Sequence, residues 1–87
     1  MDIKTEKAVV DTYAGIMRTV CVYYTEGNHH NKDKAVACFN TAIHFMRACF
    51  PKTYKGKEYD NWVLNNTLRA YKIDRTEFIE FILGYGR

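Results

Sequence analysis

Three polar side chains that could do chemistry fall on one face of a helical stretch, because Asn40, His44 and Arg47 are spaced by four and three residues. A histidine transfers protons near neutral pH, and an arginine can hold an anion. General acid–base catalysis also needs a group that orients the base, and no carboxylate on the same stretch is placed to orient His44. We therefore predict that the chain is not an enzyme. A carboxylate supplied by another helix would favour the alternative, an enzyme centred on His44.

The cysteines and histidines could suggest a metal site, but their spacing argues against one. A helix through this stretch puts Cys38 and Cys49 on its apolar side and His44 near the opposite side, so the three cannot meet at one ion. The two cysteines are also eleven positions apart, roughly 16 Å along a helix, which is too far for a disulfide. His29 and His30 are adjacent, whereas a structural zinc site needs four ligands at suitable spacing. We predict no metal and no cofactor.

Length and composition limit the class of protein. Eighty-seven residues, 47% of them hydrophobic and 15% aromatic, are enough for one domain with a small core. The three cysteines form no Cys-x-x-Cys pair, which predicts reduced thiols and a cytoplasmic location. We find no signal-peptide pattern and no apolar run of about 20 residues, so we expect no membrane partner. The net charge of +3 permits contact with nucleic acid without arguing for it.

The helix that must carry His44 is predicted over residues 33–50 from two adjacent apolar seams. Together the seams cover about half of the helix circumference, which is wider than the stripe of an ordinary surface helix. A helix of this kind has to contact two or more neighbours, in its own chain or in a partner. Pro51 disfavours any continuation beyond Phe50. The seams consist of Val36, Phe39, Ile43, Met46 and Phe50, and of Cys38, Ala42, Phe45 and Cys49.

Three further helices are predicted over about 5–24, 57–72 and 75–83 from apolar stripes with the helical period. Asp74 with Glu77 three residues later is typical of a capping box at the start of the last helix. The inner side of the helix over 5–24 consists of Val9, Tyr13, Ile16, Val20 and Tyr24, widened by Val10, Ala14, Met17 and Cys21. That of the helix over 57–72 consists of Tyr59, Val63, Leu64, Thr67, Leu68, Ala70 and Tyr71. That of the helix over 75–83 consists of Phe78, Ile79, Phe81, Ile82 and Leu83.

No stretch alternates with a period of two, so the predicted fold class is all-α. Four helices joined by short loops favour a small four-helix bundle or an orthogonal helical array in a single domain, 1–87. More than one topology can pack these stripes. The apolar content is generous for a chain of this size, so a homodimer is also compatible with the sequence.

Trp62 is the first candidate for recognition, because on a helix it falls among asparagine, glutamate and arginine side chains. Tryptophan is well buried on average, so the first expectation is that another helix or a chain terminus covers it. The alternative is an exposed anchor for a partner protein. The predicted partner-binding residues are Trp62, Tyr54, Tyr59, Asn66 and Arg69.

The basic stretch 47–57 is the second candidate, because it holds four cations and no acid. A phosphate backbone could be bound by such a loop. The first expectation is nevertheless a solvated loop, since runs of charge are usually solvated. The residues that would bind nucleic acid are Arg47, Lys52, Lys55 and Lys57, joined by Lys72 if one positive face connects them.

Function is predicted partly by elimination. The sequence contains no P-loop, dinucleotide fingerprint, nucleophile elbow or HExxH pattern. The prediction is a non-enzymatic protein-binding module that acts as an adaptor, an inhibitor or a regulatory subunit, in the manner of small phage or mobile-element proteins that block a host factor. Seven tyrosines and Trp62 favour it, since both residue types are enriched at interfaces. The alternative is a nucleic-acid-binding regulator that uses the basic stretch.

Overall fold

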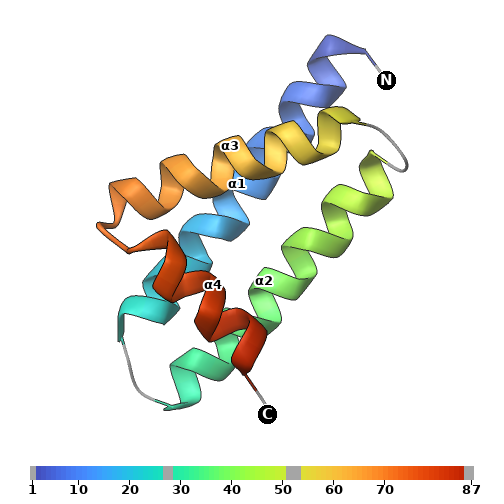
Figure 1. The fold of residues 1–87 in the computed structure, drawn as a ribbon. Coiled ribbons are helices and arrows are strands. Elements are labelled where there is room, and N and C mark those ends of the chain that lie inside the picture. The colour runs from blue at the N-terminus through green and yellow to red at the C-terminus, as the bar shows by residue number, and fades with distance from the viewer. Residues whose placement is uncertain (1, 27–28, 51–53, 86–87) are drawn as a thin grey trace.

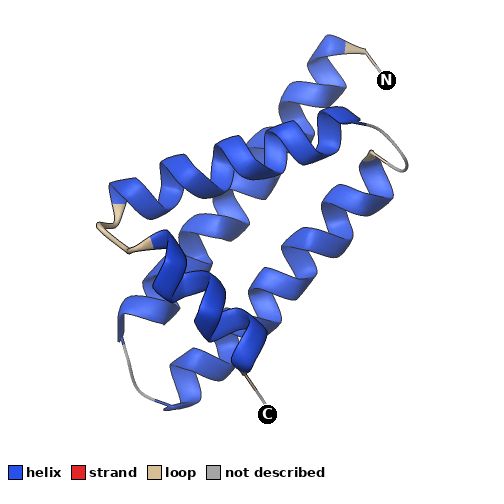
Figure 2. Cartoon of the chain, in the orientation of Figure 1, coloured by secondary structure: helices blue, strands red, loops and turns tan. Residues whose placement is uncertain are grey.

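A computed structural model describes residues 2–26, 29–50 and 54–85, and within these ranges the chain forms four α-helices and no strand (Figures 1 and 2). The predicted all-α class is confirmed. The helices are α1 (Ile3–Glu26), α2 (His29–Cys49), α3 (Tyr54–Ala70) and α4 (Arg75–Gly84). Among the described residues, no helix combines the length and the apolar character that crossing a membrane requires.

Helices α1 and α2 run side by side in opposite directions, and α3 crosses α1 (Figure 1). The first helix begins earlier than predicted because Asp2 caps it: the Thr5 backbone N–H donates to Asp2 Oδ1 at 2.7 Å. That hydrogen bond lowers the pKa of Asp2, as expected for a carboxylate that accepts a backbone N–H at a helix start.

The core lies where α1, α2 and α3 meet, and most of it was predicted from the apolar stripes. Tyr13, Met17, Val20 and Cys21 of α1 are completely buried. The remaining buried apolar residues are Val9 of α1, Ala35, Ala42 and Met46 of α2, Phe50 after it, Val63, Leu64 and Leu68 of α3, and Phe78 of α4.

Three positions differ from the predicted inner sides. Ala35 is completely buried although neither predicted seam contained it, because it lies seven positions before buried Ala42 and only about 20° from it around the helix. Ala70 is exposed, since it lies about 200° round the helix from buried Leu68. Leu83 is 64% exposed and lies about 140° from Phe78, so it cannot share the face that Phe78 buries.

The turn from α3 to α4 decides where the last helix goes. Lys72 has a φ of 57°, and two backbone hydrogen bonds close the end of α3: Lys72 N–H to Arg69 O at 3.1 Å and Ile73 N–H to Leu68 O at 2.9 Å. This is the Schellman arrangement, in which a left-handed residue ends a helix. The predicted cap of α4 is confirmed, since Asp74 Oδ2 accepts from the Glu77 backbone N–H at 2.9 Å.

Helix α4 docks through one completely buried ring, Phe78. Its ring meets Tyr24 of α1 edge-on at a centroid distance of 5.3 Å and Phe39 of α2 at 5.6 Å. Phe81 also packs on Tyr24, at 5.2 Å, and the Lys32 ammonium lies 5.6 Å from the Phe81 ring centroid. We call the α1–α2 surface that receives Phe78 the Phe78 site.

Candidate functional site

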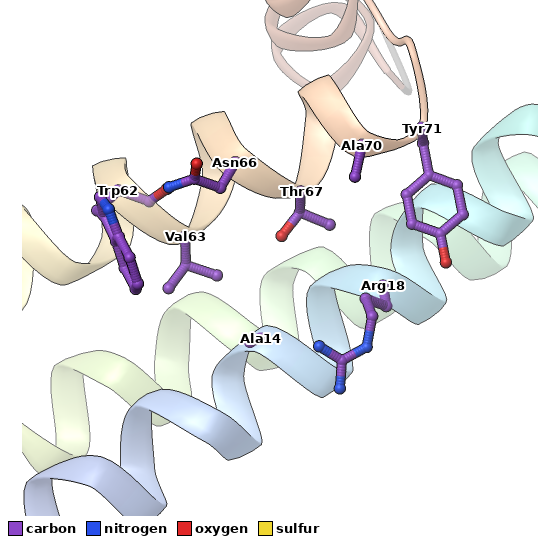
Figure 3. Close-up of a pocket in the computed structure, with 8 residues that line it drawn as sticks. All are labelled: Ala14, Arg18, Trp62, Val63, Asn66, Thr67, Ala70 and Tyr71. Carbon is purple, nitrogen blue, oxygen red and sulfur yellow. The ribbon is translucent and has the colours of Figure 1, made fainter.

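A groove of about 250 Å³ runs between α1 and α3, lined mainly by apolar atoms. Figure 3 shows Trp62 at one end, Tyr71 at the other and Arg18 on the facing wall. The described residues that line it are Ala14 and Arg18 of α1, Trp62, Val63, Asn66, Thr67 and Ala70 of α3, and Tyr71, which follows α3. We call this surface the α1–α3 groove.

The groove exists because both helices present small side chains to it. Ala14 on α1 and Ala70 on α3 leave space between the two backbones, and Val63 and Thr67 are buried beneath it. Gly15, next to Ala14, adds no bulk, and the Arg18 guanidinium lies 3.6 Å from the position that a Cβ on Gly15 would take. The arginine side chain therefore lies back along α1 beside the groove, which agrees with the usual direction of long helical side chains.

Trp62 is 63% exposed, so the expectation that a helix or a chain terminus covers it is wrong. The reason is the direction of α4, which leaves α3 at the Lys72 turn and packs on α1 and α2 through Phe78. The backbone next to the indole is ordered by Asn66, whose Nδ2 donates to Trp62 O at 2.7 Å. Trp62 and Asn66, two residues of the predicted partner-binding set, both line the groove.

The rest of the predicted partner-binding set is only partly brought together. Arg69 is exposed on α3. It lies two turns after Trp62 and about 20° from it around the helix. Tyr59 is half-buried, with its ring centroid 5.6 Å from that of Phe50, so it packs on the core beside the end of α2. Tyr54 begins α3, and its side chain lies outside the described residues.

The structure divides the predicted nucleic-acid-binding residues between two ends of the molecule. Arg47, in the last turn of α2, and Lys57, in the first turns of α3, are exposed at one end. Lys72 is exposed in the turn after α3, fifteen positions from Lys57 and roughly 22 Å away along a helix. Lys52 and the side chain of Lys55 lie outside the described residues.

The residues considered for catalysis and metal binding remain on different sides of α2. Asn40, His44 and Arg47 are exposed, whereas Cys38 and Cys49 are half-buried. In the part of the chain that the structure describes, no three His, Cys, Asp or Glu side chains cluster in a way that could hold a metal ion. The side chains of His29 and His30 lie outside that part.

A part-buried hydrogen bond links α1 to α3, the helices that form the two walls of the groove. The hydroxyl of completely buried Tyr13 on α1 donates to Asp60 on α3. Burial, and then the hydrogen bond and negative charge of Asp60, raise the pKa of Tyr13 well above its ordinary value, so the hydroxyl stays protonated and remains a donor. Burial likewise raises the pKa of the Cys21 thiol to about 11, which makes this thiol a poor nucleophile.

Sequence reasoning found two groove residues, Trp62 and Asn66, and missed the opposite wall. Pairing Ala14 and Arg18 with α3 requires knowing which helices are neighbours, and an apolar stripe does not contain that information. The adjacent small residues Ala14 and Gly15 were the one available signal, since small side chains let a second backbone approach.

Comparison with known proteins gives no match for this chain: no protein-family model, no curated protein and no solved structure. The groove must therefore be interpreted from its own chemistry. It offers an indole and a phenol ring, a guanidinium, and the hydroxyl groups of Thr67 and Tyr71. The residues described as lining it include no carboxylate, histidine or cysteine. These groups suit recognition by packing and hydrogen bonding.

Proposed function

We propose that the chain is a non-enzymatic protein-binding module in which Trp62 anchors a partner protein at the α1–α3 groove. The observation that carries the proposal is the 63% exposure of this side chain at the end of a mainly apolar groove. Tryptophan is among the residues that most often dominate binding energy at protein interfaces. An exposed apolar surface with a polar rim is typical of such interfaces.

The rim of the groove fits this role. Asn66 and Arg69 are exposed polar residues on the same helix as Trp62, and Arg18 borders the groove from α1. A polar rim excludes water from the apolar centre once a partner has bound. The Tyr13–Asp60 hydrogen bond links the two walls before any partner binds, which reduces the ordering entropy that binding must cost.

On this proposal the chain acts on its partner by occupancy. It would serve as an adaptor, an inhibitor or a regulatory subunit, a group that includes small phage and mobile-element proteins that block a host factor. The proposal includes a cytoplasmic setting, in which the three cysteines would stay reduced.

Affinity capture from native lysate, with and without nuclease, tests the proposal. We expect a nuclease-resistant protein partner on the wild-type bait and loss of that partner on Trp62→Ala. Asn61→Ala is the matched control, because Asn61 is exposed on the same helix and is not among the groove-lining residues. The melting temperature of Trp62→Ala should stay close to that of the wild type.

Two outcomes would contradict the proposal. If the partner is retained at full level on Trp62→Ala, the indole is not part of the interface. Bound material that disappears on nuclease treatment and depends on Arg47 and Lys57 would replace the proposal with the nucleic-acid-binding alternative, and binding would then weaken steeply with salt.

A further inference from the structure

We propose that the occupant of the α1–α3 groove is an acidic amphipathic helix of a partner protein, with its apolar side chains in the groove and a carboxylate opposite Arg18. This inference rests on the proposed function and adds the chemistry of the partner. Three observations carry it: the length of the groove, the charge of its lining, and the way in which α4 packs on α1 and α2 in the same molecule.

The length of the groove suits a helix. Trp62 on α3 and Tyr71 just after α3 mark its two ends. They are nine positions apart, which corresponds to about 13 Å or two and a half turns of helix. Apolar side chains at positions i, i+4 and i+7 of a bound helix span about 10 Å. Ala14 and Ala70 keep the floor low, so a helix can approach both walls closely.

The charge of the groove favours an acidic occupant. Arg18 is the one charged residue among the described lining residues, whereas outside the lining the exposed Arg69 and Glu58 of α3 carry opposite charges. A guanidinium binds a carboxylate through two parallel hydrogen bonds, which fixes orientation as well as affinity. The hydroxyl groups of Thr67 and Tyr71 can donate to the same carboxylate or to its neighbours.

Helix α4 supplies an example of this packing within the chain. It places Phe78 between Tyr24 and Phe39, and Phe81 beneath the Lys32 ammonium. Its exposed residues include Glu77 and Glu80 together with Arg75. One pair of helices in this fold therefore already accepts a helix through its aromatic side chains next to a cation, and the α1–α3 groove presents the same combination of apolar surface and cation.

The test uses the full chain and two synthetic helical peptides as probes. Both carry leucine at i, i+4 and i+7 and are cross-linked to keep the helix formed; one has glutamate and the other lysine beside the leucines. Because Trp62 is the sole tryptophan, its fluorescence reports occupancy directly. We expect the acidic peptide to shift the emission to the blue and to bind at least tenfold more tightly than the basic one, with a difference that shrinks as salt is added.

Charge reversal on the protein provides the control. Arg18→Glu should invert the preference between the two peptides, and Arg18→Gln should abolish it, whereas Arg47→Glu, an exposed residue of α2, should leave it unchanged. Arg18 is exposed, so both variants should fold, and circular dichroism checks this. Equal affinity for the two peptides, or a preference that survives Arg18→Glu, would overturn the inference.

Failure of this inference can be told apart from failure of the proposed function. A captured partner that is lost with Trp62→Ala and retained with Arg18→Glu leaves the protein-binding function standing and rejects the acidic helix. Light scattering tests the remaining occupant, the α4 helix of a second copy, which carries exposed Leu83 beside Glu80. If the protein is a dimer, and if Leu83→Glu and Trp62→Ala each abolish the dimer, then the groove is occupied by α4 of a second copy and the partner helix is rejected.

Discussion

Helix α1 borders two sites that could receive a further helix, and the described residues of the chain fill only one of them. At the Phe78 site, on α1 and α2, an aromatic ring of α4 is completely buried. At the α1–α3 groove, Trp62 is 63% exposed at the edge of a cavity. Both residues are large aromatics on helices, so their difference does not come from residue type. It comes from where the backbone leads α4.

The Lys72 turn makes the choice between the two sites. Its left-handed residue and the two hydrogen bonds that close α3 direct the chain back across α1 and α2. The contrast indicates that the Phe78 site serves folding, and under the proposed function the α1–α3 groove serves binding. If so, substitutions at the first should change stability and substitutions at the second should not.

The largest expected effect is at the Phe78 site. Phe78→Ala removes a completely buried ring that touches Tyr24 and Phe39, and such substitutions typically cost about 3–5 kcal/mol of unfolding free energy. Urea denaturation followed by circular dichroism measures the loss. Phe78→Leu is the control and should cost clearly less, because it fills most of the volume. A loss below about 1 kcal/mol for Phe78→Ala would mean that α4 contributes little to the fold.

The start of α4 and the position of Phe78 on it were largely predictable because their signals are local. The Asp74 cap and the apolar positions after it can be identified within a dozen residues of sequence, and the cap has the predicted hydrogen bond. The exposure of Trp62 was not predictable in this way. It depends on the φ angle of Lys72 and on which helices pair, and the apolar pattern encodes neither. Arg18 was missed for the same reason, since only the pairing of α1 with α3 brings it to the groove.

The second expected effect is in the hydrogen bond between the two walls of the groove. Tyr13→Phe removes the hydroxyl that donates to Asp60. Loss of a hydrogen bond to a charged acceptor costs about 1.5–3 kcal/mol, and we expect the lower end of this range because the bond is part-buried. The same substitution should slow the loss of stability at high pH. The pKa of Tyr13 is raised in the folded chain from an ordinary 10.0, so its contribution is complete below pH 10 and is lost as the pH rises above that value.

Measurements of unfolding free energy between pH 8 and pH 11 test the pH dependence. One proton held more tightly by the folded chain gives a slope of up to about 1.4 kcal/mol per pH unit. Cys21 adds to the slope in an overlapping range, because its pKa rises from 9.0 to about 11 on burial; Cys21→Ala is therefore the matched comparison. An identical slope in wild type and Tyr13→Phe would show that Tyr13 does not carry the dependence.

The third effect is a gain in stability at the turn that separates the two sites. Lys72 adopts a φ of 57°, a conformation that costs a residue with a Cβ about 1 kcal/mol relative to glycine. Lys72→Gly should therefore raise the unfolding free energy by up to about 1 kcal/mol. Lys72→Ala removes the same charge while keeping the Cβ, so it should give no such gain. Equal stability of the two variants would exclude backbone strain as the cause.

The smallest expected effect on stability is at the α1–α3 groove. It decides whether the groove differs from the Phe78 site in contributing little to folding. Trp62→Ala should change the unfolding free energy by no more than about 0.5 kcal/mol, because most of the indole is already in contact with water. For the same reason the fluorescence maximum of the native chain should lie close to that of the chain in urea. A blue-shifted native maximum together with a loss of several kcal/mol would mean that the chain fills this groove too. A small change, with binding abolished, would show that folding and binding use separate aromatic residues on opposite sides of one turn.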